Sequence, residues 1–255
     1  MKTGKYTAFR WRKGEMEPVR YPHAVRLRDL LWIDAQKAAL AENTRRFVMK
    51  RPANHALLTG ARGTGKSSLV KAMLNEFAGN GLRLVEVAAA ELPNLPEIVQ
   101  PLRGLTERFV LYVDDFSVAA QDPGLAALKA ALDGDIEAPP ENVLIYATSN
   151  RRHLMPEFHS ENEEYRWIEG ELHPGESTEE KISLSERFGL WLSFPPYNQD
   201  QYLELVRLHL RRLGVKRWNA ELQQTALRWA LARASRSGRV AMQFARDQAG
   251  QAPAN

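Results

Sequence analysis

The sequence predicts an α/β fold with a parallel central sheet, followed by a small helical domain. Three observations predict it. A glycine-rich stretch, G-x-x-x-x-G-K-S over residues 60–67, lies between a short apolar run and a helical pattern. Two later apolar runs, 109–113 and 142–148, end in polar side chains, as buried parallel strands do at the edge where ligands bind. Three helical patterns then follow Pro195-Pro196.

The expected elements follow from periodicity and from stop signals. In chain order they are an irregular strap over 1–28, a helix over 36–49, a strand over 55–59, a helix over 68–79, a strand over 82–87, short helices through 93–101, a strand over 109–113, a helix over 125–132, a strand over 142–148, a strand over 190–194 and tail helices over 201–213, 219–234 and 238–248. Asp29 or Asp34 is expected to cap the first helix, and Asp200 the first tail helix. We divide the chain into the strap 1–28, an α/β domain 29–196 and a helical lid 197–250.

The glycine-rich stretch predicts a phosphate-binding loop. It consists of Gly60, Ala61, Arg62, Gly63, Thr64, Gly65, Lys66 and Ser67. Glycines at these places let the loop turn successive backbone N–H groups onto a phosphate, at the positive end of the next helix. Lys66 is expected to reach the β- and γ-phosphates, and the Ser67 hydroxyl to bind the accompanying Mg²⁺. With Ser68, these residues are the predicted nucleotide-binding set.

Two strand ends supply the expected catalytic groups. Asp114 and Asp115 end an apolar run, and Asp114 lies 48 residues after Lys66. We expect Asp114 to hold Mg²⁺, and Asp115 to orient or deprotonate the attacking water. Asn150 ends the next strand and is expected to sense the γ-phosphate or hold that water.

An apolar patch precedes the phosphate loop at Leu30-Leu31-Trp32-Ile33. Such a patch can close over an adenine ring, and Leu31 and Ile33 are the candidates for this contact. Core packing explains the patch nearly as well.

The net charge of +4 conceals basic ends around an acidic centre. Residues 1–28 and 199–250 are each +6, so 29–198 is −8. Basic flanks are typical of a nucleic-acid surface, and also of solvated helix faces that pair between subunits. In the strap, Tyr6, Phe9 and Trp11 alternate with basic residues, which suits either base stacking or attachment of the strap to the domain.

Composition favours a soluble protein. There is no cysteine, so disulfides and thiolate metal sites are excluded. No apolar run approaches the roughly 18 residues that a membrane span needs, and no signal-peptide core follows Met1. We therefore expect a cytoplasmic protein without a membrane partner. The segment 153–184 is rich in glutamate and contains histidines, but it lacks the spacing of a metal site and is interpreted as an acidic surface insertion.

The chain resembles AAA+ ATPases. Residues 60–67, the pair Asp114-Asp115 and Asn150 resemble the Walker A, Walker B and sensor-1 elements of that family. The resemblance spans most of 25–250. Phrases at 146–154 and 185–190 are similar to a bacterial family of AAA+-like ATPases known mainly as a domain of unknown function.

The resemblance implies roles for two arginines. Arg187 would be an arginine finger that reaches a neighbouring subunit's γ-phosphate, and Arg239 would be the sensor-2 residue of the lid. By local pattern alone, an arginine before an apolar strand, as Arg187 is, is more often a surface or capping residue. Arg239 could by the same reasoning form an ion pair on a helix face. The sequence departs from the family where Asp115 replaces a common glutamate and Trp32 a common small residue.

These observations predict an ATPase that binds ATP and Mg²⁺, assembles with copies of itself and changes the conformation of a protein or nucleic-acid client. The alternatives are an ATP-dependent switch with little turnover and a nucleic-acid loader that uses the basic ends.

Overall fold

The structure, a computed structural model, describes residues 4–116, 123–134, 138–150, 166–168, 171–173, 184 and 186–251. The chain divides into two compact units, which are described separately. The first contains Met1–Thr59 and Lys66–Ser193, and the second contains Gly60–Gly65 and Phe194–Asn255.

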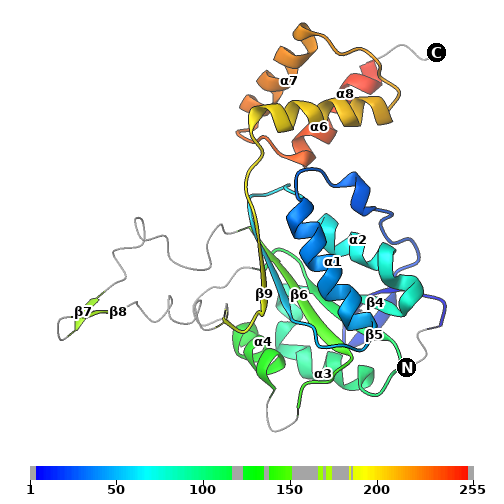
Figure 1. The fold of residues 1–255 in the computed structure, drawn as a ribbon, viewed down its shortest axis with the longest axis vertical. Coiled ribbons are helices and arrows are strands. Elements are labelled where there is room, and N and C mark those ends of the chain that lie inside the picture. The colour runs from blue at the N-terminus through cyan, green and yellow to red at the C-terminus, as the bar shows by residue number, and fades with distance from the viewer. Residues whose placement is uncertain are drawn as a thin grey trace. The chain divides into compact units, whose positions relative to one another are not determined.

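A mostly parallel sheet forms the centre of the first unit (Figure 1). Among the described residues it has seven strands in the order β2-β1-β4-β5-β6-β3-β9. Their bounds are β1 Ala8–Arg12, β2 Glu15–Pro18, β3 Ala56–Gly60, β4 Leu82–Val87, β5 Arg108–Val113, β6 Val143–Ser149 and β9 Leu190–Phe194. The strands β1, β4, β5, β6 and β3 pair in parallel in that order, whereas β2 is antiparallel to β1. The predicted α/β class is confirmed.

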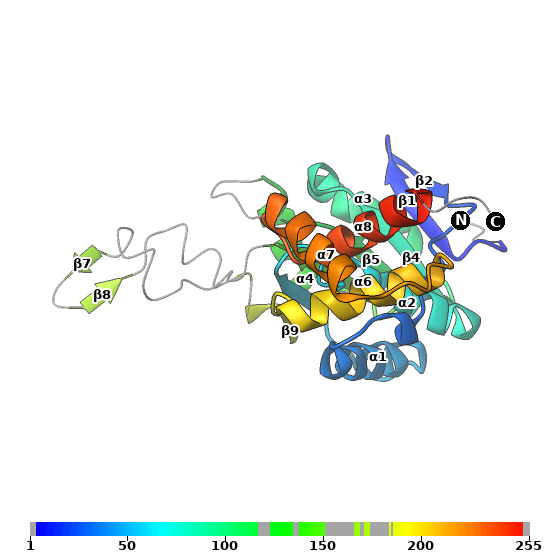
Figure 2. The ribbon, with the colours of Figure 1, turned by 90° about the horizontal axis from the view of Figure 1, so that it is seen from above.

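The helices of the first unit connect these strands. They are η1 Leu27–Asp29, α1 Asp34–Val48, α2 Lys66–Phe77, η2 Ala78–Asn80, η3 Ala89–Asn94, α3 Leu95–Val99, η4 Gln100–Leu102 and α4 Pro123–Asp133. Seen from above, α1 and α2 lie on one face of the sheet and α3 and α4 on the other (Figure 2). Helices on both faces cover the central strands, so β3, β5 and β6 are buried throughout their length and consist mainly of apolar residues.

Strand alternation assigns side chains to the two faces. Phe109, Leu111 and Val113 of β5 enter the hydrophobic cluster that also contains Leu95 of α3 and Leu128 of α4. The intervening residues of β5 therefore point toward α1 and α2. Because Asp114 continues that second series after the strand ends, it lies on the face where α2 begins.

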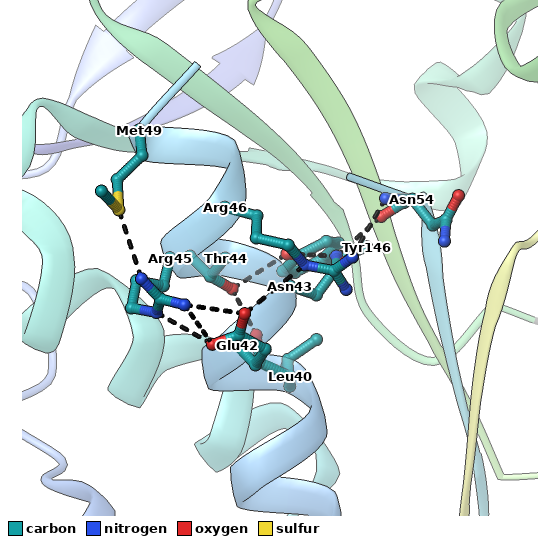
Figure 3. Close-up of polar contacts among 9 residues, drawn as sticks. All are labelled: Leu40, Glu42, Asn43, Thr44, Arg45, Arg46, Met49, Asn54 and Tyr146. Carbon is teal, nitrogen blue, oxygen red and sulfur yellow. Dashed lines mark hydrogen bonds and ion pairs between the residues drawn. The ribbon is translucent and has the colours of Figure 1, made fainter. Parts of the chain in front are cut away.

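A buried polar network attaches α1 to the sheet (Figure 3). The hydroxyl of Tyr146, on β6, is bonded to Asn43 Nδ2 at 3.1 Å and to Thr44 Oγ1 at 2.9 Å. Asn43 also donates to the carbonyl of Asn54 at 2.8 Å and accepts from its N–H at 3.0 Å. Burial raises the pKa of Tyr146 to about 12, so it remains a neutral hydrogen-bonding group. The network fixes the segment that enters β3.

The second unit is a helical bundle. Its helices are α6 Gln199–Arg212, α7 Ala220–Ala232 and α8 Gly238–Gln251. Tyr202 and Val206 of α6 and Phe244 of α8 are buried. The Trp229 ring of α7 packs edge-on against the Phe244 ring, with the two ring centres 5.7 Å apart. Aromatic packing of this kind stabilises a small core beyond the area that it buries.

Three local expectations are wrong. The expected irregular strap over 1–28 contains two strands, because β1 and β2 extend the sheet and leave Phe9 and Trp11 buried. At α1 the N-cap is Ile33, without a side-chain cap, so Asp34 lies inside the helix, where it pairs with Lys37 at 2.6 Å. The cap of α6 is Asn198, which accepts from Gln201 N at 2.9 Å, and Asp200 lies in the first turn.

The structure covers little of the acidic insertion 153–184. Its described residues are β7 Arg166–Ile168 and β8 Glu171–His173, which pair antiparallel, and the single residue Leu184. The rest of the predicted insertion lies outside the described residues. In the part of the chain that is described, no group of three or more His, Asp or Glu is placed to hold a metal, and no helix has the length and apolarity needed to cross a membrane.

Candidate nucleotide site

The predicted phosphate loop has a backbone that requires glycine. Gly63 has φ +71° and Gly65 φ +102°, in the region that side-chain-bearing residues rarely adopt. A Cβ on Gly63 would lie 2.6 Å from the Cβ of Ser237. Along the chain the loop leads directly into α2 at Lys66, which is the order of elements in phosphate-binding loops.

Within the second unit, the loop is attached to the start of α8. The Gly63 carbonyl accepts a hydrogen bond from Gly238 N at 2.9 Å, and the Thr64 carbonyl accepts from the Tyr197 hydroxyl at 2.9 Å. The backbone nitrogen of Arg239 lies 3.7 Å from the position of a Cβ on Gly63. Arg239, the second residue of α8, thus lies beside the predicted phosphate loop at the start of its helix.

Asp114 is the centre of a hydroxyl cluster in the first unit. Its Oδ1 accepts from Ser67 Oγ at 2.7 Å and from Thr148 Oγ1 at 2.6 Å. The N–H of Asp115 donates to Thr148 Oγ1 at 3.0 Å, which fixes the turn after β5. Three elements therefore meet here: the first turn of α2 and the carboxyl ends of β5 and β6.

The electrostatics of the cluster favour a carboxylate. Burial opposes ionisation of Asp114, but the hydroxyls of Thr148, Tyr112 and Ser67, with the charge of Lys71, outweigh it and hold the pKa of Asp114 below its usual value. Tyr112 is 1% exposed, and its hydroxyl lies near Asp114, Ser67 and Thr148 but makes no hydrogen bond of standard geometry within the described residues. Burial raises the pKa of Tyr112 far above its usual value, so the hydroxyl keeps its proton.

This donor set fits Mg²⁺. Carboxylate and hydroxyl oxygens are the protein ligands that this cation prefers, usually with several retained waters. Ser67 Oγ and Asp114 would hold the ion, and the Tyr112 hydroxyl is a buried polar group beside them that a retained water would satisfy.

A second set of contacts joins Lys66 to Asp115 through Asn150. Lys66 Nζ donates to Asn150 Oδ1 at 3.1 Å, and Asn150 Nδ2 donates to Asp115 Oδ1. Lys66 is 5% exposed, whereas Asp115 is exposed and has φ +51°. A non-glycine residue at positive φ is uncommon and recurs at functional sites. The amide thus lies between a buried cation and an exposed carboxylate.

Arg187 is not part of this cluster. It lies just before β9, and Leu190 N donates to the His55 carbonyl at 3.1 Å, at the start of β3. Lys66 follows the opposite end of β3. The five residues of β3, at about 3.3 Å each, separate its two ends by roughly 15 Å. Arg187 therefore lies near the amino-terminal ends of the strands, whereas the cluster lies at their carboxyl ends.

The predicted adenine contacts are only partly exposed. Ile33 is 3% exposed and packs in the core, whereas Leu31 is half-buried. Between them Trp32 has φ +56°, which turns the chain sharply before α1. Lys37 Nζ supports this turn by donating to the Leu30 carbonyl at 2.8 Å. The role of the patch in adenine binding stays a prediction.

Sequence reasoning missed Thr148 and Tyr112. Both look like ordinary strand residues, and no motif marks them. A signal was available in strand alternation, because Thr148 is two residues before Asn150 and Tyr112 two residues before Asp114. Residues that precede a strand-end site residue by two share its face.

The N-terminal aromatic residues do not form a stacking surface. Phe9 and Trp11 are 4% and 6% exposed, and they belong to the cluster that packs against α3 and α4. Arg10 and Arg12, between and beyond them, are exposed, and Arg10 pairs with Glu86 at 2.7 Å. Of the two interpretations of this segment, its burial supports attachment to the domain.

Comparisons with known proteins identify the chain's family and structures with a similar fold. Residues 4–252 match the family described as Protein of unknown function (DUF815). No curated protein matches the chain. Among solved structures, the Thermotoga maritima RuvB Holliday junction branch migration motor has a TM-score of 0.53 and 14% identity, over 88% of this chain and 72% of that one.

Two RuvB mutants from Thermotoga maritima are also similar. Each has a TM-score of 0.55, with 14% and 16% identity, and covers 83% of this chain. The chain spans only 59% and 60% of their lengths. At this identity the likeness establishes the fold, which is the AAA+ P-loop fold that the sequence predicted.

Proposed function

Because the chain belongs to the DUF815 family, whose function is not established, we propose from its site that it is an ATPase of the AAA+ type. It binds ATP with Mg²⁺ and uses hydrolysis to change the conformation of a partner macromolecule. The observation that carries this proposal is the meeting of Lys66, Ser67, Asp114 and Asn150 at one edge of the sheet.

The chain's own groups divide the work of binding. Backbone N–H groups of the loop 60–65 and the first turn of α2 receive the phosphates, and Lys66 offsets the charge of the β- and γ-phosphates. Ser67 and Asp114 would hold Mg²⁺, which when bound neutralises charge that develops on the phosphoryl oxygens. Thr148 keeps Asp114 ionised and oriented toward Ser67.

Hydrolysis is an in-line attack of water on the γ-phosphorus. Asp115 is exposed at the same edge of the sheet and accepts the proton of the attacking water or orients it. Asn150 links this carboxylate to Lys66, so the water-activating and phosphate-binding groups move together.

Two arginines complete the proposal. Arg187 lies on the far edge of its own sheet, so it serves a neighbouring copy of the chain, and the active enzyme is an oligomer. Arg239 begins α8 beside the loop residue Gly63, which suits a lid residue that senses bound nucleotide. A guanidinium at the γ-phosphoryl group contributes about 10³–10⁵ in rate where such fingers are established.

The second candidate function is an ATP-dependent switch with little turnover. The Asp115 carboxylate accepts a hydrogen bond from Asn150, which competes with a water molecule for the same oxygen. Aspartate is also one methylene shorter than the common glutamate. Both features favour slow hydrolysis, in which case binding rather than turnover would control assembly or partner affinity.

Steady-state ATP turnover measured against protein concentration tests the proposal. Specific activity should rise with concentration, and both Arg187→Ala and Lys66→Ala should abolish most of it. Arg217→Ala, which removes an exposed arginine paired with Glu221 at 2.7 Å, is the matched control and should leave turnover unchanged. Low activity that is independent of concentration and unaffected by Arg187→Ala would overturn the shared site.

A binding measurement separates the candidates. Tight MgATP binding with negligible turnover would favour the switch. A nucleic-acid loader would instead show DNA or RNA binding that weakens steeply with salt.

A further inference from the structure

Arg187 forms an ion pair with Asp133, the last residue of α4. Arg187 Nε and Asp133 Oδ2 are 2.6 Å apart, and their side chains are 27% and 48% exposed. The contact uses Nε, the nitrogen next to the aliphatic stem. A carboxylate held there fixes the plane of the rigid guanidinium group.

The backbone around Arg187 is held on both sides. Arg187 N donates to the Leu184 carbonyl at 3.2 Å, and Leu184 and Phe188 are 0% and 4% exposed. A Cβ on Gly189 would lie 2.6 Å from the side chain of Asn54, the residue that Asn43 anchors from α1. The guanidinium therefore projects from a fixed support.

Asp133 is supported in the same way. Leu128 and Leu132 of α4 are buried in the core, and Gly134 N donates to the Ala130 carbonyl at 2.9 Å to close the helix. Nearby His55 stays neutral at physiological pH because burial lowers its pKa to about 4, although Asp133 opposes this shift. His55 therefore carries no positive charge that would compete with Arg187 for the Asp133 carboxylate.

We propose that Asp133 is a positioning residue for Arg187, which it holds in the orientation that presents the guanidinium to the neighbouring subunit's γ-phosphate. The inference rests on the proposed ATPase function and names a partner that no sequence motif indicates. Asp133 acts through Arg187 and is not itself a catalytic residue.

The solvent exposure of the Arg187–Asp133 ion pair distinguishes a positioning role from a contribution to folding stability. Both side chains are partly solvated, and exposed ion pairs contribute little to folding. Loss of the pair should therefore leave the melting temperature within about 2–4 °C of the native value. A misplaced guanidinium, in contrast, should reduce kcat about 10- to 100-fold, because small errors in the position of a catalytic group are costly.

The first experiment measures kcat and KM for the native chain, Asp133→Asn, Asp133→Glu, Arg187→Ala and the double variant Asp133→Asn/Arg187→Ala. Asp133→Asn should lower kcat with KM unchanged, and Asp133→Glu should recover part of the loss. In the Arg187→Ala background, Asp133→Asn should have no further effect. Glu221→Gln removes a carboxylate from an exposed ion pair of similar length and serves as the control.

The second experiment mixes chains. Lys66→Ala chains keep Arg187 but lack a working site, so they should restore turnover to Arg187→Ala chains. Adding Asp133→Asn to the Lys66→Ala chain should prevent this recovery, whereas adding it to the Arg187→Ala chain should not. This asymmetry is expected only if Asp133 acts on the arginine of its own chain.

The outcomes separate the two proposals. A native chain that binds no ATP would overturn the proposed function and this inference with it. If the native chain binds ATP without turnover, ATP-dependent self-association measured by sedimentation replaces kcat, and Asp133→Asn should weaken it as Arg187→Ala does. Normal turnover or association in Asp133→Asn would overturn the inference and leave the ATPase proposal standing. The same would follow if Asp133→Asn lowered turnover as much in the Arg187→Ala chain as in the native chain.

Discussion

Replacing Thr148 by valine tests how the candidate metal ligand is held. Valine has nearly the same shape but lacks the hydroxyl that donates to Asp114 Oδ1 at 2.6 Å and accepts from Asp115 N at 3.0 Å. A hydrogen bond to a charged group is worth about 1.5–3 kcal/mol, and a neutral one about 0.5–1.5 kcal/mol. Asp115 N also has Asp114 Oδ1 as an acceptor at 3.1 Å, so the second loss is at the low end of its range.

Thr148→Val should therefore lower the free energy of unfolding by about 2–4 kcal/mol. Urea unfolding at neutral pH measures this change, with Thr148→Ser as the matched control. Serine keeps the hydroxyl and loses one buried methyl group, so it should cost about 1 kcal/mol. Mg²⁺-dependent nucleotide binding should weaken only in the valine variant. Equal stability of the two variants would refute the assignment of Thr148 as the residue that orients Asp114.

Three further predictions concern other parts of the structure. Gly63→Ala should destabilise the chain by about 2–5 kcal/mol and weaken nucleotide binding, because φ is positive and Ser237 fills the space. Thermal unfolding checks this against Gly79→Ala, where a Cβ meets open space. Asn43→Ala should cost about 2–4 kcal/mol in urea unfolding, since three hydrogen bonds are lost, and an unchanged midpoint would contradict the role of the network. The pKa of Asp114 is lowered on folding, so its stabilising contribution is present above the unfolded value of 3.8 and is lost as pH falls below it. Acid unfolding of Asp114→Asn should therefore have a weaker pH dependence than that of the native chain, and identical profiles would contradict it.

Several basic residues of the helical tail, residues 199–250, make contacts within it. The basic residues that give residues 199–250 their positive charge lie in helices α6 to α8 and in the segments between them, and some of these residues have local contacts. The Arg233 guanidinium lies 3.6 Å from the centre of the Trp229 ring, and Arg217 pairs with Glu221. Burial, with the nearby charges of Arg212 and Arg246, lowers the pKa of His209 to about 4, so histidine adds no charge there at neutral pH.

Much of the fold was predictable because its signals are local. Buried parallel strands are apolar over their whole length, and β3, β5 and β6 formed where such runs occur. The tight turn of the glycine-rich loop was predictable because its glycines are required by the backbone conformation of a few consecutive residues. Asp114 and Asn150 were predictable because each follows a strand, and the ends of adjacent parallel strands meet.

By itself, the sequence determined the fold class, the glycine-rich loop before α2 and the strand-end residues of the candidate site, since each depends on neighbours along the chain. The tertiary structure alone decided that Thr148 orients Asp114, that β1 joins the sheet, and that Asp133 holds Arg187 from 54 residues away. Those contacts depend on strand register and helix packing, which arise only when distant segments fold together. Local sequence patterns do not predict these contacts.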